Sequence, residues 1–497
     1  MPAFNPELFI STLALIGAVI VIASLLSGLV DRSGLPQVAV FLALGALIGP
    51  YGLGIVDVTV DSPILRVVAT LSLALVLFTD AVSLNVAELS SHKLLAFLVL
   101  GPGTVFSALL VSVASVWLLH IPVALAAMLG AALASTDPVL LRSILRRPEL
   151  SPTVRQALRI ESGLNDALLL PIILVGIAAA QHMAAAPADW ARLALRMVVL
   201  SPAAGIVVAL GAIGALELVR RKVGVRRDYE SIYSLGIAFA AFAAAESVHG
   251  SGFIAAFAAG LTVAALDVEL CDCFLEYGET TAEMALLFTF VLFGVSLIWT
   301  GLATATPVAL LFTVVVFMSR PLAFFPALAF AQLPWRDRIL LGWFGPRGLS
   351  SLLLILLPVF AGISGSNFLL SVCCLVVLFS VVLHGLSPLV LFRSRGKRGS
   401  QEAVAPPQMA PAPAKQAPLP ILDETQTPSE FIDIAELRSL MQRDPRSVVL
   451  VDARSQRSYD ESEYLLEGAV RIDPERAVAE ARRLNLPREA VLAVFCA

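Results

Sequence analysis

The chain has 497 residues, of which 58% are hydrophobic and 14% are charged, and its mean hydropathy is +0.87. An ordinary soluble protein has about a quarter of its residues charged, so this composition excludes a typical soluble domain and favours a protein that lies in a lipid bilayer. A net charge of −4, without a basic cluster on an aromatic-rich segment, gives no reason to expect a nucleic-acid partner. The five cysteines match no zinc site, and we expect no cofactor.

Residues 7–395 are a series of apolar runs of roughly 17 to 28 residues, separated by short stretches of Gly, Pro or charged residues. Because lipid offers the backbone no hydrogen-bond partners, these runs predict an all-α polytopic membrane protein with about thirteen transmembrane helices. The first run, about residues 9–30, is interpreted as a span and not as a cleaved signal peptide. The predicted spans centre on Gly17, Leu42, Leu73, Leu109, Leu133, Leu169, Val207, Ile237, Ala256, Phe290, Val316, Leu352 and Val377.

The composition changes after residue 395. Residues 396–427 are rich in Pro and Ala and predict an extended linker, and residues 428–497 have the character of a partial cytoplasmic α/β domain. The apolar stretch VVLVDAR predicts a strand in this domain.

The distribution of basic residues predicts the orientation of the chain in the membrane. They gather in alternate connections, namely 142–159, 220–227, 336–338 and 393–398, whereas the intervening connections carry almost no Lys or Arg. The positive-inside rule therefore places the C-terminal tail in the cytoplasm, and an odd number of spans places the N-terminus outside. We expect an integral protein of a prokaryotic-type inner or plasma membrane.

The fifth predicted span contains an acidic residue beside a proline, in AALASTDPVLLRS. A charge inside the bilayer costs kilocalories, so such groups usually face a cavity and have a function. Pro138 lacks a backbone donor and disfavours helix at the preceding residue, which predicts an interrupted helix. The oxygens of Thr136 and Asp137 would then be free to coordinate a cation.

The sixth predicted span contains the segment RIESGLNDALLLP. Ser162 and Asp166 are four residues apart and share one helical face, while Glu161 and Asn165 share the adjacent face. A hydroxyl and a carboxylate on one face are oxygen ligands suited to a small cation. Asp80, near the end of the third span, is a further oxygen donor.

Two arginines complete the intramembrane charges. Arg320 precedes a proline in the eleventh span, and Arg347 lies in a Gly-Pro-Arg-Gly interruption of the twelfth. Interruptions in the fifth and twelfth spans predict a transporter core of inverted repeats in which two broken helices cross. At such a crossing, Asp137 is expected to compensate helix N-termini and Arg347 helix C-termini.

The segments ASTDPV, ESGLND, HGSGFIAAFAAGL and GPRGLSS, in this order, resemble the NhaP-like sodium/proton exchanger branch of the monovalent cation:proton antiporter superfamily. The resemblance covers about residues 7–395. It implies secondary antiport of Na⁺ or Li⁺ against H⁺, and not enzymatic activity. It also implies a homodimer, and the Asn-Asp pair implies electroneutral exchange, since branches with two adjacent aspartates are electrogenic.

The same resemblance implies a role for each candidate residue. Asp166 would bind cation and proton alternately, with Ser162, a Thr136 oxygen and Asp80 as further cation ligands, although the position of Asp80 is more often glutamate in this family. The exchange site would also include Asp137, Asn165 and Glu161. Glu161 would pair with Arg320 and hold Asn165, and Arg347 would neutralise the helix crossing.

Simpler interpretations stay open for several of these residues. Glu161 and Arg320 could form a purely structural ion pair, Asp80 could lie at the water interface, and Ser162 could bond back to its own helix. K⁺/H⁺ exchange is the alternative within transport, because oxygen ligands alone do not determine ion size. A channel would instead give a flux independent of a pH gradient.

The tail resembles the rhodanese family, in which one strand ends in D-x-R and a later strand leads to a cysteine, here Cys496. The sequence ends at Ala497, before the loop of backbone amides that would hold a reactive thiolate. We therefore interpret the tail as a partial regulatory module. A membrane-anchored sulfurtransferase or thiol sensor is the alternative of another class.

Overall fold

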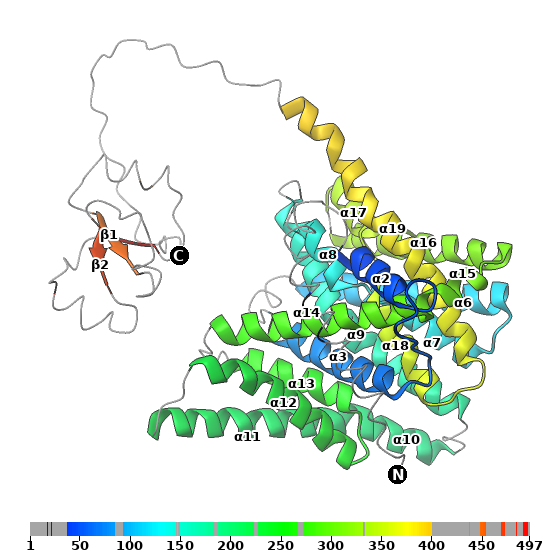
Figure 1. The fold of residues 1–497 in the computed structure, drawn as a ribbon, viewed down its shortest axis with the longest axis horizontal. Coiled ribbons are helices and arrows are strands. Elements are labelled where there is room, and N and C mark those ends of the chain that lie inside the picture. Colours follow the sequence, from blue (N-terminus) through cyan, green and yellow to red (C-terminus); the bar gives the residue numbers. More distant parts are fainter. Residues whose placement is uncertain are drawn as a thin grey trace. The chain divides into compact units, whose positions relative to one another are not determined.

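The computed structural model divides the chain into two compact units, Met1–Ala403 and Val404–Ala497, which are described separately (Figure 1). The structure describes, besides a few single positions, residues 37–84, 93–145, 150–181, 186–222, 227–266, 272–331, 333–399, 448–453, 469–472 and 491–495.

The described part of the first unit is helical. Its helices are α2 (Gln37–Ile48), α3 (Pro63–Val82), α5 (Lys93–Leu98), the π-helix η1 (Val99–Val105), α6 (Phe106–Leu119), α7 (Val123–Ala134), α8 (Pro138–Leu145), α9 (Pro152–Ala180), α10 (Pro187–Leu195), the π-helix η2 (Arg196–Leu200), α11 (Ser201–Lys222), α12 (Arg227–Ser247), α13 (Gly252–Ala265), α14 (Asp272–Val295), the 3₁₀ turn η3 (Leu297–Trp299), α15 (Thr300–Ala303), α16 (Pro307–Ala327), the 3₁₀ turn η4 (Leu328–Ala331), α17 (Trp335–Trp343), α18 (Leu349–Phe360) and α19 (Ser366–Gly399).

A helix covers every predicted span centre after the first. The first predicted span lies outside the described residues, apart from Gly17 and Val21. Seven helical stretches in the described part are long and apolar enough to cross a membrane, or eight if the bent pair Met284–Val295 and Leu297–Ala303 forms one span. The polytopic helical fold is therefore present, and the count of about thirteen spans stays a prediction.

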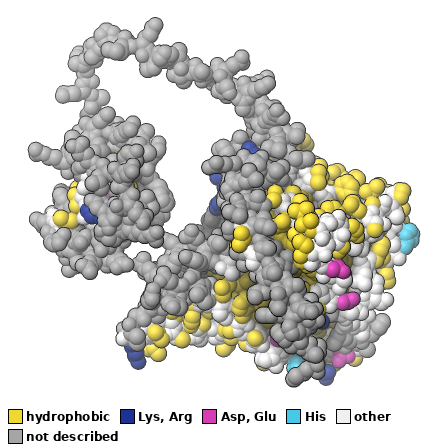
Figure 2. Space-filling view, in the orientation of Figure 1, with side chains coloured by type: hydrophobic (Ala, Val, Ile, Leu, Met, Phe, Trp, Pro, Cys, Tyr) yellow, Lys and Arg dark blue, Asp and Glu magenta, His cyan; other side chains and the backbone are white. Residues whose placement is uncertain are grey.

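The outer surface of this unit is apolar, as helices that face lipid require. Val207 on α11 and Val314 and Leu322 on α16 are each more than half exposed. Figure 2 shows such side chains over much of the described surface of the helical unit. Inside, α3 packs against α13 and α14. The α3–α13 contact requires a small residue, because a Cβ at Gly260 would overlap the Phe78 carbonyl.

The helix that carries ESGLND is continuous and central. Helix α9 begins at Pro152 and extends over 29 residues. The side chain of Ser151 caps its N-terminus by accepting a hydrogen bond from the Val154 N–H at 3.3 Å. Its middle turns are buried, so its polar residues lie inside the helical unit. Helix α9 contacts α3, α7, α17 and α18, and these contacts position the site described below.

Two of these contacting spans are interrupted. Helix α7 ends at Ala134 and α8 begins at Pro138, which is the break that the proline predicts. Helix α17 ends at Trp343 and α18 begins at Leu349, across the Gly-Pro-Arg-Gly segment. Each break leaves backbone N–H and C=O groups without partners inside their own helix.

The described part of the second unit contains a three-stranded parallel sheet in the order β2-β1-β3. Its strands are β1 (Val448–Asp452), β2 (Val470–Arg471) and β3 (Val491–Phe495). In register, Val451 of β1 pairs with Val470, and Val448 pairs with Val491. The strand predicted in VVLVDAR is thus present as β1.

The linker prediction needs one correction. Helix α19 continues to Gly399, so residues 396–399 are helical and not extended. The physical reason is that Lys397 and Arg398 are good helix formers and that no proline lies between residue 396 and Pro406. The remainder of the predicted linker, 400–427, lies outside the described residues.

Candidate functional site

The two interrupted helices meet, and Asp137 connects them. The Asp137 N–H donates to the Pro346 carbonyl at 2.9 Å. Its carboxylate accepts from the Val139 N–H at 2.8 Å and from the Leu349 N–H at 2.6 Å. One buried carboxylate therefore caps the N-termini of both α8 and α18, where it also favours the two helix dipoles.

Arg347 performs the opposite task at the end of α7. Its Nη1 donates to the Ala134 carbonyl at 2.5 Å and to the Ser135 carbonyl at 2.9 Å. The side chain is 1% exposed, and its positive charge lies at the negative end of a helix. The structure thus places both Asp137 and Arg347 at the helix ends expected of them.

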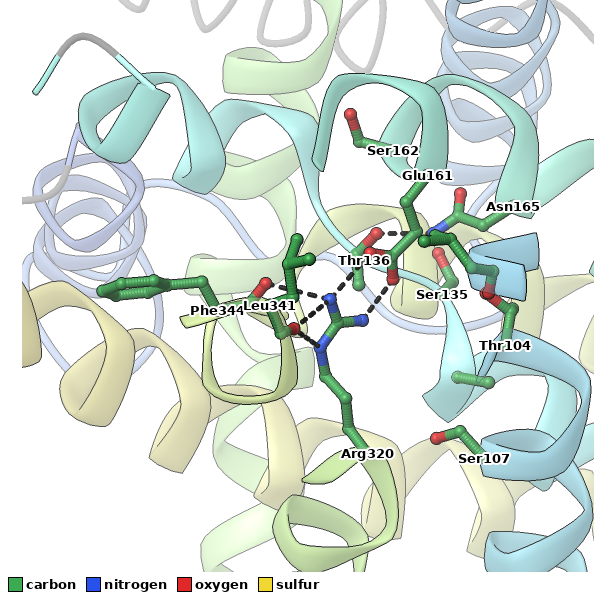
Figure 3. Close-up of polar contacts among 12 residues, drawn as sticks. Thr104, Ser107, Ser135, Thr136, Glu161, Ser162, Asn165, Arg320, Leu341 and Phe344 are labelled. Atoms are coloured by element: carbon green, nitrogen blue, oxygen red, sulfur yellow. Dashed lines mark hydrogen bonds and ion pairs between the residues drawn. The ribbon is translucent and has the colours of Figure 1, made fainter. Parts of the chain in front are cut away.

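Arg320 and Glu161 form a buried ion pair between α16 and α9 (Figure 3). Both guanidinium Nη atoms bond the Glu161 carboxylate, one of them at 2.7 Å. Arg320 also donates to the carbonyls of Leu341 and Phe344, so it caps the C-terminus of α17. Its guanidinium lies 4.1 Å from the centre of the Phe324 ring. The pair thereby attaches the end of a broken helix to α9.

Asn165 and Asp166 face the other break. The Asn165 Nδ2 donates to Thr136 Oγ1 at 2.5 Å, and the Ser135 hydroxyl donates to Asp166 Oδ1. Asn165 is 0% exposed and Asp166 is 1% exposed. Within the described residues, Asn165 Oδ1 and Asp166 Oδ2 have no hydrogen-bond partner. A buried polar atom without a partner is costly, so the carboxylate oxygen of Asp166 can bind a proton or a cation, and the amide oxygen of Asn165 can accept a hydrogen bond or coordinate a cation.

The remaining candidates lie nearby but with other partners. Ser162 donates to the Arg159 carbonyl of its own helix at 3.2 Å, and in Figure 3 its side chain points away from the Thr136–Asn165 contact. Asp80 is half-buried in the last turn of α3. Its backbone approaches α9 at Gly163, one turn before Asp166. Asn165, expected to be held by Glu161, has its described hydrogen bond to Thr136 instead.

Three serines at the site were not found from the sequence. Ser135 bonds Asp166, and its carbonyl accepts from Arg347. Ser350, at the start of α18, lies within reach of the same Asp166 carboxylate. Ser380 on α19 accepts the Arg347 N–H at 2.6 Å. The position of Ser135 immediately before Thr136 in the same break is the sequence signal that could have identified it.

Comparison with known proteins identifies the family of this chain. Residues 18–392 match the family model described as the transmembrane sodium/hydrogen exchanger. The chain belongs to this family. It is 26% identical over 384 residues to the K(+)/H(+) antiporter NhaP of Alkalimonas amylolytica, covering 76% of this chain and 65% of that protein. It is 25% identical over 401 residues to the Na(+)/H(+) antiporter NhaG of Bacillus atrophaeus, covering 77% and 75% respectively.

The fold is similar to that of the sodium proton antiporter MjNhaP1 from Methanocaldococcus jannaschii. The TM-score is 0.64 at 19% identity, and the match covers 76% of this chain and 99% of that one. This chain spans about two thirds of the length of the first curated relatives it matches.

The buried ion pair gives a first prediction. Glu161→Gln leaves the Arg320 guanidinium without its counter-charge, and removing one partner of a buried pair costs roughly 3–5 kcal/mol. We expect a large decrease in the melting temperature of the detergent-solubilised protein. Asp189→Asn is the matched control, because the Asp189–Arg192 pair is solvent-exposed at 3.4 Å and such pairs contribute about 1 kcal/mol or less. Equal shifts in both variants would contradict a stabilising role.

The crossing gives a second prediction. A Cβ at Gly348 would overlap the Asp137 carboxylate, so Gly348→Ala must displace the side chain that caps α8 and α18. We expect loss of folded protein or of cation-dependent proton movement in membrane vesicles. At Gly342, in α17 on the other side of the break, a Cβ would lie 3.5 Å from the nearest atom, which is ordinary contact, so Gly342→Ala should behave like wild type. A fully active Gly348→Ala variant would show that the close approach is dispensable.

Proposed function

We propose that the chain is a secondary active antiporter that exchanges Na⁺ or Li⁺ for H⁺ by competition at Asp166. One observation carries this proposal. Of the three buried acidic side chains in the described helical unit, Asp137 and Glu161 have both carboxylate oxygens bonded, whereas Asp166 keeps Oδ2 without a hydrogen-bond partner among the described residues. Because the chain belongs to a family of exchangers, we infer that the mobile ion binds at this carboxylate.

The mechanism needs only competition and alternating access. A proton and a cation cannot occupy the Asp166 carboxylate together, so each displaces the other. Movement of the two repeats about the crossing then exposes the site to one side of the membrane at a time. Because Asp137, Arg347 and Arg320 are engaged at helix ends, their charges hold the crossing while Asp166 changes its occupant.

The proposed cation ligands besides Asp166 are Thr136, Ser162 and Asp80. The Thr136 hydroxyl already accepts from Asn165, which fixes this part of the break against α9. For Ser162 to coordinate the ion, its hydroxyl must turn from the Arg159 carbonyl. Asp80 would approach from α3, whose end lies against Gly163 of α9.

The identity of the ion is part of the proposal. Relatives named as K(+)/H(+) and as Na(+)/H(+) antiporters match this chain at similar identity, so K⁺ is the alternative to Na⁺. The Asn165–Asp166 pair places one ionisable carboxylate at this position of α9, which supports exchange of one cation for one proton. We also propose a homodimer with the N-terminus outside and the tail in the cytoplasm, on the basis of the family resemblance and the basic connections.

The tail supports a second candidate of a different class, a thiol-sensing or sulfurtransferase module. Its parallel sheet, in the order β2-β1-β3, is compatible with the rhodanese-like α/β resemblance. Cys496 follows β3 directly in the sequence and lies outside the described residues. Removal of residues 404–497 tests this candidate. Unchanged exchange would make the tail regulatory or dispensable, and loss of every activity would favour the tail as the functional part.

The central experiment measures proton movement in inside-out vesicles with an imposed ΔpH. Addition of Na⁺, Li⁺ or K⁺ should collapse ΔpH in wild type and identify the ion. Asp166→Asn, which keeps the side-chain shape and removes the charge, should abolish the response, whereas Asp189→Asn on the exposed surface should not. Exchange that persists in Asp166→Asn would disprove the proposal. A cation flux that ignores the pH gradient would indicate a channel.

A further inference from the structure

Helix α19 holds the segment between α17 and α18 at two points. Upstream of Arg347, the His384 Nε2 lies 3.2 Å from the Trp343 carbonyl, at the C-terminus of α17. The Arg347 N–H itself donates to the Ser380 hydroxyl at 2.6 Å. Ser380 and His384 are four residues apart on α19, so they lie on one helical face. The break is therefore fixed to α19 on either side of Gly345 and Pro346.

The hydrogen bonds at these two points form one directed chain. Because Ser380 Oγ accepts from the Arg347 N–H, its own proton is available for His384 Nδ1, which lies 3.1 Å away. The Trp343 carbonyl can only accept, so the other ring nitrogen, Nε2, must carry the proton. The neutral Nε2–H form of His384 satisfies the contacts with Ser380 Oγ and with the Trp343 carbonyl, while the Ser380 carbonyl, 3.3 Å from Nδ1, receives no hydrogen bond from the ring in this form.

The surroundings of His384 are those of an apolar core. The side chain is 6% exposed and packs edge-on against Phe317, at 5.8 Å between ring centres, and obliquely against Trp343 at 5.9 Å. An imidazole is costly to bury in such a place unless its nitrogens are hydrogen-bonded. Packing alone does not account for a buried imidazole at this position, whereas its hydrogen bond to the Trp343 carbonyl gives it a structural role.

The hydrogen bond from His384 to Trp343 complements the contacts that Arg320 makes at the end of α17. Arg320 caps the Leu341 and Phe344 carbonyls at the end of α17, and His384 caps the carbonyl of Trp343 between them. The Trp343 carbonyl also accepts from the Gly345 N–H at 3.0 Å, so the bond from His384 is a second one that attaches this helix end to α19. Together, the two side chains fix where α17 ends and where Arg347 begins its contact with α7.

We infer that Ser380 and His384 are positioning residues for the exchange site, and this inference depends on the function proposed above. They hold the backbone of Arg347, whose side chain holds the Ala134 and Ser135 carbonyls. Ser135 in turn donates to Asp166. The clamp on α19 therefore sets the geometry of the oxygens around Asp166 without contacting the ion.

The test compares four single variants and one double variant in the vesicle assay. Ser380→Ala removes the acceptor for Arg347, and His384→Met removes the donor to Trp343 while keeping a long apolar side chain. His384→Gln returns an amide donor to the same place. Ser371→Ala is the control, because Ser371 is a half-buried serine on α19 whose described hydrogen bond goes to the Asn367 carbonyl of its own helix. The readouts are the half-saturating cation concentration, the maximal rate and the melting temperature.

Loss of one hydrogen bond changes an equilibrium by about fivefold. We expect Ser380→Ala and His384→Met each to raise the half-saturating cation concentration by about this factor, with the maximal rate within about twofold of wild type. The half-saturating cation concentration of His384→Gln should lie close to that of wild type, and that of Ser371→Ala should be unchanged. The double variant Ser380→Ala, His384→Met should show less than the product of the two single effects, because both act through one clamp.

Several outcomes would overturn this inference. One is an unchanged half-saturating concentration in Ser380→Ala and His384→Met. Another is an equal rise in the half-saturating cation concentration in His384→Gln and His384→Met, which would show that His384 acts through packing and not through hydrogen bonding. A decrease confined to melting temperature would make the clamp structural. If wild type itself shows no cation-triggered proton movement, the proposed function fails, and this result differs from one in which wild type exchanges and the variants match it.

Discussion

The structure depends on how two interrupted helices are completed inside a buried helical unit. Each break leaves backbone N–H and C=O groups that lipid cannot satisfy. Asp137 supplies acceptors for the N-termini of α8 and α18, and Arg347 supplies donors for the end of α7. Opposite charges thus lie at opposite helix ends, where the dipoles favour them. Because each side chain reaches the other broken helix, the crossing is held together by the same bonds that complete its helices.

This constraint separates the buried charges into two groups. Asp137, Arg347 and the Glu161–Arg320 pair are engaged at helix ends, and removing any one would leave an uncompensated charge or orphaned backbone. Asp166 differs, since one of its oxygens accepts from Ser135 while the other has no partner among the described residues. A scaffold of fully bonded charges around one incompletely bonded carboxylate is an arrangement in which an ion can exchange without loss of the fold.

Family and fold similarity agree with this organisation but leave the choice of ion open. The relatives named above include both K(+)/H(+) and Na(+)/H(+) antiporters. Both ions take oxygen ligands, so selectivity depends on small differences in the spacing of those oxygens. In this chain, hydrogen bonds connect α19 to Arg347 and Arg347 to Ser135, and by the inference above they influence the spacing of the oxygens around Asp166.

The sequence by itself determined the helical membrane fold, the break before Pro138 and the one at 345–348, because hydropathy, proline and glycine act locally. The spacing of ESGLND likewise placed its polar residues on two adjacent faces of one helix. Only the tertiary structure decided which side chains and helix ends these polar residues bond. Arg320 and Glu161 are 159 residues apart, and Asn165 bonds Thr136 instead of Glu161. Ser380 and His384 gave no sequence signal, because a hydroxyl or imidazole in an apolar run acquires its role from whichever helix end packs against it.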